Sequence, residues 1–213
     1  MNLGEMHDMV GGALARGTSL DTTEVPLFVR MAARKIERAY TFQYMDRFST
    51  FTFDADSDYP RRVTFANTRI KRFIFCRIAD DNGLFQYQKK IEPMELNSIE
   101  EGVPNAFWLD GVNYLIFNKT PTEDYIAEIA WHEYTNWPTD TSATTWLLLN
   151  AEDLLLAESI LQGAAWIRDD KQLARWQGLR SEAFKSALDA DSELRAGAQD
   201  LVMNYTGAFR DDR

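Results

Sequence analysis

The sequence contains few of the side chains on which catalytic and covalent chemistry most often depends. Its 213 residues include one cysteine and two histidines. A single cysteine, Cys76, cannot form an intramolecular disulfide, which is consistent with assembly in a reducing cytoplasm. Because Cys76 lies in the mostly apolar segment FIFCRI, we interpret it as a small buried side chain and not as a reactive thiol.

Long hydrophobic runs are also missing. The longest, among them 146–149 and 154–157, have four residues each, whereas a transmembrane helix requires about 20. The first ten residues carry Glu5 and Asp8 and lack both a basic leader and an apolar stretch. We therefore expect neither a membrane span nor a secretory signal.

Positive charge is scarce overall but locally concentrated. The chain has 23 Lys and Arg against 33 Asp and Glu, a formal net charge of −10. This balance argues against a protein whose main task is to bind nucleic acid or an anionic membrane. Residues 61–90 are the exception, with eight basic and two acidic residues, so this segment carries +6 and the remainder −16.

Apolar residues recur at helical spacing near both ends of the chain. The predicted helices cover residues 3–16, 23–40, 145–168 and 171–194. Thr23 is the expected cap of the second helix, Pro26 fits its first turn, and Asp169 is the expected cap of the last helix. We place Trp146, Trp166 and Trp176 in the core or at a subunit contact.

The segment 195–213 is predicted to be an arm that orders on a partner. Gly197 and Gly207 interrupt the helical pattern, so we expect the last helix to end near Leu194. The segment nevertheless keeps more apolar side chains than a frayed end normally has. These candidate partner contacts are Leu201, Val202, Met203, Tyr205 and Phe209.

Between the helical regions, alternating apolar residues and turn signals predict strands from about residue 48 to 138. We expect the strands near 63–65, 69–78 and 84–91 to form a meander, followed by a short helix at 93–101 and a hairpin with a two-residue type I′ turn at Asp110-Gly111. The predicted fold class is α+β: residues 1–47 and 139–213 form an antiparallel helical bundle from both chain ends, and 48–138 form an inserted antiparallel β lobe.

No pattern in the sequence predicts a catalytic, cofactor or metal site. His132 lies near Glu128 and Glu133, but nothing nearby supplies a third ligand at a recognised spacing, so a solvated strand histidine is favoured. Gly11-Gly12 lacks the strand and lysine of a phosphate-binding loop. A hydrolase that uses His132 and Glu133 is the weakest hypothesis.

The basic segment is a candidate contact surface for a partner. Its proposed contacts are Arg61, Arg62, Lys71, Arg72, Lys89 and Lys90. A positive lobe on a negative remainder is typical of a molecule that meets differently charged partners at its two ends. Two alternatives remain open: a solvated strand face whose Lys and Arg protect a sheet edge, and a module that binds nucleic acid or glycan.

Three segments resemble the head-to-tail adaptor, or connector, proteins of tailed bacteriophages, including those known as tail tubular protein A. Residues 25–38, VPLFVRMAARKIER, are similar to the family's opening helix. Residues 143–157, ATTWLLLNAEDLLLA, resemble its threonine, Asn-Trp-Leu-Leu and Pro-Asp-Leu pattern, with Thr145 and Glu152 where the family often has Asn and Pro. Residues 163–170, GAAWIRDD, are similar to the stretch before its second helix, which carries a tryptophan, here Trp176.

This resemblance implies a structural virion protein without enzymatic activity or cofactor. It implies a ring of about twelve subunits beneath the portal protein, which joins head to tail and continues the DNA channel for genome retention and ejection. The implied partners are the portal and a tail nozzle, tail tube or other tail protein, and DNA passes through the lumen without specific binding. The implied location is the neck of the virion, after assembly in the host cytoplasm.

Overall fold

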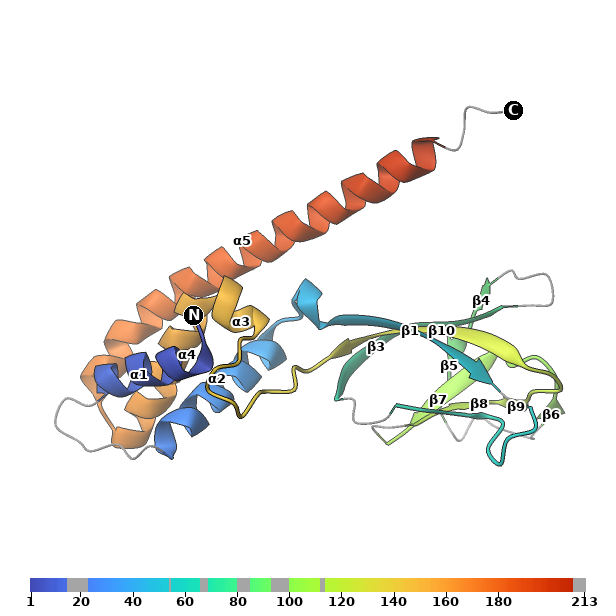
Figure 1. Cartoon of the computed structure of the whole chain (residues 1–213), viewed down its shortest axis with the longest axis horizontal. Coiled ribbons are helices and arrows are strands. Elements are labelled where there is room, and N and C mark those ends of the chain that lie inside the picture. Colours follow the sequence, from blue (N-terminus) through green and yellow to red (C-terminus); the bar gives the residue numbers. More distant parts are fainter. Residues whose placement is uncertain are drawn as a thin grey trace. The chain divides into compact units, whose positions relative to one another are not determined.

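The computed structural model describes residues 1–14, 23–53, 55–65, 69–79, 85–92, 100–111 and 114–208, with side chains for all of these except Phe53, Phe85 and 197–208. The fold is α+β, and the chain divides into two compact units (Figure 1). The helical unit comprises Met1–Tyr44 and Asn136–Arg213, and the β unit comprises Met45–Thr135. These two boundaries were predicted at 47/48 and 138/139.

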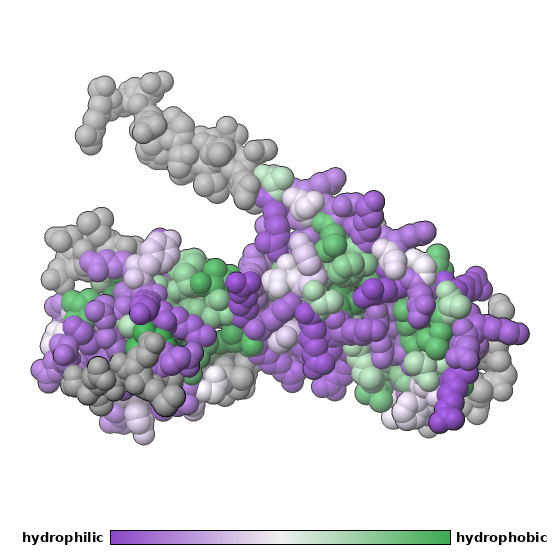
Figure 2. All heavy atoms as spheres, turned by 180° about the vertical axis from the view of Figure 1, so that it is seen from behind, coloured by the Kyte–Doolittle hydropathy of each residue, from purple (hydrophilic) through white to green (hydrophobic). Residues whose placement is uncertain are grey.

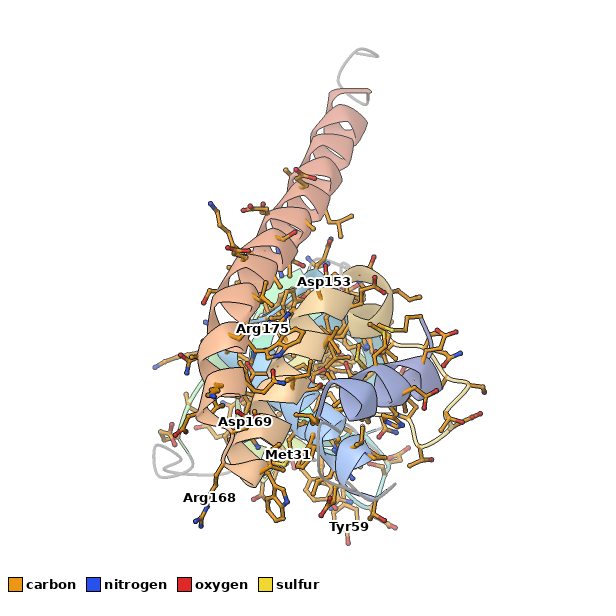
Figure 3. The ribbon with its side chains drawn as sticks, turned by 90° about the vertical axis from the view of Figure 1, so that its left-hand side faces the viewer. Met31, Tyr59, Asp153, Arg168, Asp169 and Arg175 are labelled. Carbon is orange, nitrogen blue, oxygen red and sulfur yellow. The ribbon has the colours of Figure 1, made fainter. Side chains whose placement is uncertain are left out.

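The described part of the helical unit is built around one central helix. Its elements are α1 (Leu3–Leu14), α2 (Glu24–Ala39), a 3₁₀ turn η1 (Gln43–Met45) that leads into the β unit, α3 (Trp146–Asn150), α4 (Glu152–Ile167) and α5 (Asp170–Ala208). Helix α4 packs against α1, α2 and α5, and Figure 3 shows it flanked by α5 and α1. Among the described residues, no helix is long and apolar enough to cross a membrane.

Helix α2 confirms the predicted inward face and corrects its predicted cap. Its buried residues include Val25, Phe28, Ala32 and Ile36, which recur at helical spacing. Thr23, however, has right-handed helical backbone angles, φ −85° and ψ −31°, and its side chain makes no capping hydrogen bond. The prediction that Thr23 caps α2 is therefore wrong, because a capping side chain requires an extended backbone at that position.

The predicted helix 145–168 is two helices. Ala151 has φ −144° and ψ 42°, outside the helical region, and separates α3 from α4. Thr145 caps α3 through its side-chain oxygen, which accepts a hydrogen bond from the Leu148 amide at 3.4 Å. Leu147 before the break and Leu154 after it are both buried. The apolar pattern of the sequence therefore continues across the break and gives no sign of it.

The connection from α4 to α5 confirms the Asp169 cap and corrects the end of α5. Arg168 adopts the left-handed conformation with φ 57°, and the Asp169 carboxylate accepts hydrogen bonds from the amides of Lys171 and Gln172, both at 3.1 Å. Helix α5 then continues to Ala208 instead of ending near Leu194. Gly197 is tolerated inside this helix, since one glycine costs only about 1 kcal/mol relative to alanine. Phe209 lies outside the described residues.

Trp166 does not lie in the core, so of its two predicted positions the subunit contact remains. Its side chain is 65% exposed, although it packs at one side against Phe28 with 6.3 Å between ring centroids. Trp146 and Trp176 are half-buried. Trp166 is exposed because it lies in the last turn of α4, where α5 departs. Large hydrophobic side chains are also exposed on the β unit, and Figure 2 shows hydrophobic patches between hydrophilic residues on one face of each unit.

The β unit contains two four-stranded sheets that share one core. The strands are β1 (Asp46–Phe53), β2 (Arg62–Thr64), β3 (Ile70–Ala79), β4 (Phe85–Tyr87), β5 (Lys89–Lys90), β6 (Glu100–Glu101), β7 (Ala106–Asp110), β8 (Tyr114–Phe117), β9 (Lys119–Thr120) and β10 (Tyr125–Glu133). The sheets have the orders β1-β10-β3-β4 and β2-β8-β7-β5, and β6 pairs with β9. Buried residues from both sheets, among them Ile78, Phe107, Leu115 and Ile129, form a single hydrophobic cluster.

The predicted meander is right for β3 and β4, which pair antiparallel, and wrong for β2, which pairs with β8 in the other sheet. Strand β10, the last in sequence, lies between β1 and β3, and β5 pairs in parallel with β7. The β7–β8 hairpin forms as predicted, but its last pair is Asp110 with Tyr114, so the connection has three residues and not two. Of the predicted helix 93–101, residues 93–99 lie outside the described residues, and Glu100–Glu101 is strand β6.

Candidate interaction surfaces

The residues considered for catalysis do not come together. His132 and Asp46 are paired across β10 and β1, and His132 Nδ1 lies 2.8 Å from an Asp46 carboxylate oxygen. Glu133 instead contacts Arg47 at 3.3 Å, and Glu128 accepts a hydrogen bond from Arg77 at 2.6 Å. In the described part of the chain, no three His, Cys, Asp or Glu side chains are placed to hold a metal ion.

The thiol of Cys76 is buried, as the sequence predicts. Burial raises its pKa to about 12, because a thiolate in apolar surroundings loses its hydration. At neutral pH the side chain is therefore a neutral thiol that packs with Ile78 and Ile129 in the core of the β unit. It has the role of a small hydrophobic residue.

The structure separates the predicted basic residues into two clefts. The first, here named the β3 cleft, has a volume of about 670 Å³ and is lined by Lys71, Arg72 and Lys90. Its lining also includes Phe73, Phe75 and Tyr87, and none of its described lining residues is acidic. Lys90 meets the β3 residues here because the chain crosses from β4 in one sheet to β5 in the other between Tyr87 and Lys89.

The second cleft, named the Tyr59 cleft, has a volume of about 400 Å³ and contains Arg61 and Arg62. The Arg62 guanidinium lies 3.9 Å from the ring centroid of Tyr59 and 4.8 Å from that of Tyr114. This stacking holds Arg62 in place by cation–π attraction. Nη1 of Arg61 is buried and has no hydrogen-bond partner among the described residues.

Lys89 belongs to neither cleft. Its side chain is exposed, while its backbone amide donates to the Asn105 carbonyl at 3.2 Å. The six predicted basic contacts are therefore not one continuous patch. They form one cationic cleft with aromatic walls, one cleft with two arginines, of which Arg62 stacks on tyrosines and Arg61 on Trp108, and one exposed lysine.

The predicted apolar arm is the C-terminal part of α5. Residues 201–203 and 205 lie within this helix, but their side chains are not among those that the structure describes. Near the end of the part of α5 whose side chains are described, the Arg195 guanidinium donates to the Thr41 carbonyl at 2.9 Å and to buried Asp191 of α5 at 2.9 Å. Figure 1 shows α5 extending beyond the other helices of this unit.

One surface was missed by the sequence reasoning, which considered only the buried face of α2. A cleft of about 350 Å³ along this helix is lined by Leu27, Arg30, Met31 and Arg38. Leu27 and Met31 are 49% and 47% exposed. The sequence does contain a signal for this surface: Arg30, Arg34 and Arg38 are four residues apart, so the three arginines lie on one side of a helix.

No protein-family model matches the sequence, and comparison with curated proteins gives no significant match.

Proposed function

We propose that this protein is a structural, non-enzymatic adaptor of a bacteriophage neck. It forms a ring beneath the portal protein, joins head to tail and continues the DNA channel. The observation that carries this proposal is α5: 39 residues in one helix, about 58 Å long, of which the last turns lie beyond Arg195. A helix that extends beyond the other helices of its unit, and that has apolar residues in the sequence of this extension, is suited to contact a partner.

The order of elements supports the same proposal. Helices from both chain ends belong to one unit, and the strands of the β unit lie between them in the sequence. We propose that these helices make the antiparallel bundle that the resemblance to the connector family implies, with the β unit as an insertion. The bundle would form the ring and dock on the portal, and the β unit would meet the tail proteins through the β3 and Tyr59 clefts. A long helix and a cationic cleft then serve different partners of one adaptor.

The charge of the chain suits a channel for DNA. At −10 per chain, a ring of about twelve copies carries about −120. Acidic side chains repel phosphates, so DNA slides past them and is not held by specific contacts. We therefore propose that the acidic surface faces the lumen and that the basic clefts face protein partners.

The test is assembly with the portal protein of the same phage, followed by electron microscopy. Closed rings on one end of the portal are the expected result. Persistent failure to associate with any portal or tail protein of that phage would overturn the proposal. A free monomer alone would not, because such rings often form only on their template.

The role of the arm is tested with matched variants. The double variant Leu201→Ser with Tyr205→Ser should weaken portal or ring association at least tenfold. The reason is the loss of apolar surface buried at the contact, which contributes about 25 cal/mol of binding free energy per Å². The control, Asn204→Ala combined with Thr206→Ala in the same segment, should leave association unchanged. Equal effects of both variants would show that the apolar side chains of the arm do not make the proposed contact.

One observation favours a second function, nucleic-acid or glycan binding by the β unit. Tyr87 is 69% exposed in the β3 cleft, which Arg72 and Lys90 also line. Bases and sugars stack on such aromatic side chains while cations neutralise phosphates. This function predicts salt-dependent binding of a single-stranded oligonucleotide or oligosaccharide that Arg72→Gln with Lys90→Gln weakens. Affinity that the substitutions leave unchanged excludes it.

A further inference from the structure

The outward side of α2 is basic and apolar, and the described residues of the helical unit do not cover it. We name the α2 face by Leu27, Arg30, Met31 and Arg38, which line one shallow cleft. Arg30 and Arg38 are exposed and have no ion-pair partner among the described residues. Met31 is labelled in Figure 3. Two large apolar side chains left exposed between unpaired cations are typical of a contact surface.

Between residues 182 and 193 the exposed side of α5 is mainly acidic, since Glu182, Asp189 and Glu193 outnumber Lys185. We name the α5 face by Leu179, Glu182, Asp189 and Glu193, which recur at helical spacing on the side away from α4. Leu179 is 43% exposed, and the three carboxylates are exposed and have no ion-pair partner among the described residues. The α2 face runs from residue 27 to 38 and the acidic part of the α5 face from 182 to 193, so both are about 17 Å long.

These two faces cannot meet within one chain. The fully buried carboxylate of Glu158 in α4 binds Lys35 of α2 through one oxygen and Arg180 of α5 through the other. Helix α4 therefore lies between α2 and α5 at this level. Each named face lies on the side of its helix that is opposite to the buried side. Complementary charges that cannot pair inside a molecule can pair between copies of it.

We propose that the α2 face of one copy binds the α5 face of the next copy. This inference rests on the proposed ring function, because it specifies the contact that would close the ring. An interface between two different faces is head-to-tail, and a head-to-tail contact produces a closed ring or an open filament, never a closed two-fold dimer. The apolar side chains Leu27, Met31 and Leu179 provide burial, and the charges set register and partner choice.

The decisive experiment exchanges the charges. Variant A is Arg30→Glu with Arg38→Glu, and variant B is Glu182→Arg with Glu193→Arg. In A both faces are acidic and in B both are basic, so each alone should self-associate at least tenfold more weakly than the native chain. An equimolar mixture of A and B should recover assembly, because every contact then joins an acidic face to a basic one. A chain that carries all four substitutions should also recover it.

Assembly is measured by analytical ultracentrifugation of the protein alone and by electron microscopy of portal-docked rings. The control, Arg72→Glu with Lys90→Glu in the β unit, changes the net charge as much as A and should leave self-association unchanged. All substituted side chains are exposed, so folding should be retained, which circular dichroism checks.

The outcomes separate this interface from the ring itself. Native assembly that A and B do not weaken, or weakening that their mixture does not restore, overturns the interface and leaves the proposed ring function standing. Absence of native assembly both alone and on the portal overturns the ring function and the interface together. Loss in A and B with recovery in the mixture supports both.

Discussion

The carboxylate of Glu158 in α4 accepts a hydrogen bond from Arg180 in α5 at 3.1 Å, although the Glu158 side chain is fully buried. Lys35 of α2 lies 2.5 Å from the other oxygen of the same carboxylate, so one buried anion joins three helices. Burial of an anion costs several kcal/mol unless cations and hydrogen bonds compensate it. The contacts to Glu158 therefore determine how α2, α4 and α5 are held together.

Removal of both cations should destabilise the chain more than the two single losses added. Lys35→Met or Arg180→Met leaves Glu158 with one cation and should lower the free energy of unfolding by about 1–2 kcal/mol. The double variant leaves the buried carboxylate without a cation and should cost about 3–5 kcal/mol. Adding Glu158→Leu should recover much of that loss. Urea denaturation measures all four, and strictly additive effects would contradict the prediction.

Two glycines in helices should respond in opposite ways to alanine. A Cβ at Gly163 in α4 would overlap Leu14 Cδ1 and lie 3.2 Å from Phe28 Cδ2, so Gly163→Ala should cost about 1–3 kcal/mol by overpacking. A Cβ at Gly178 in α5 meets nothing within 4 Å, so Gly178→Ala should stabilise by about 0.5–1 kcal/mol through helix propensity. Thermal denaturation compares them, and stabilisation by both would show that α1 does not pack on α4 at Gly163.

The left-handed backbone at Arg168 predicts a stabilising substitution. Arg168 follows the last turn of α4 with φ 57°, a conformation that is unfavourable for residues with a Cβ (Figure 3). Arg168→Gly should therefore stabilise by about 0.5–1 kcal/mol, although glycine also adds entropy to the unfolded chain. Arg168→Ala keeps the Cβ and serves as the control. The thermal unfolding midpoint should rise for glycine alone, and an equal response to alanine would point to loss of the arginine charge instead.

Local patterns predicted the elements better than their connections. The buried face of α2, the Asp169 cap and the β7–β8 strands depend on residues near one another in sequence, so spacing revealed them. The pairing of β5 with β7 and the position of β10 between β1 and β3 depend on packing between distant segments. The break at Ala151 carries no glycine or proline, so no local signal marked it.

The candidate surfaces follow the same division. A surplus of basic residues in 61–90 was visible in the sequence, but its separation into two clefts requires the crossing from β4 to β5 that brings Lys90 to β3. The α2 face was overlooked because arginines on the polar side of a helix are normally solvated. Its exposed Leu27 and Met31 distinguish it, and their exposure depends on which neighbours cover α2.

A pH-dependent loss of stability is expected from His7 in α1. Burial lowers the pKa of this imidazole from its ordinary value of 6.5, and neighbouring Asp8 offsets the shift in part. Nε2 is buried and has no hydrogen-bond partner among the described residues, so a proton there has no acceptor. The unfolded chain therefore binds the proton more readily than the folded chain. The stability that neutral His7 contributes is present above pH 6.5 and is lost as the pH falls through 6.5 towards the folded pKa. The unfolding midpoint of the native chain should fall more between pH 8 and pH 5.5 than that of His7→Gln, which cannot titrate. Identical pH profiles for the two proteins would show that His7 is solvated in the folded chain.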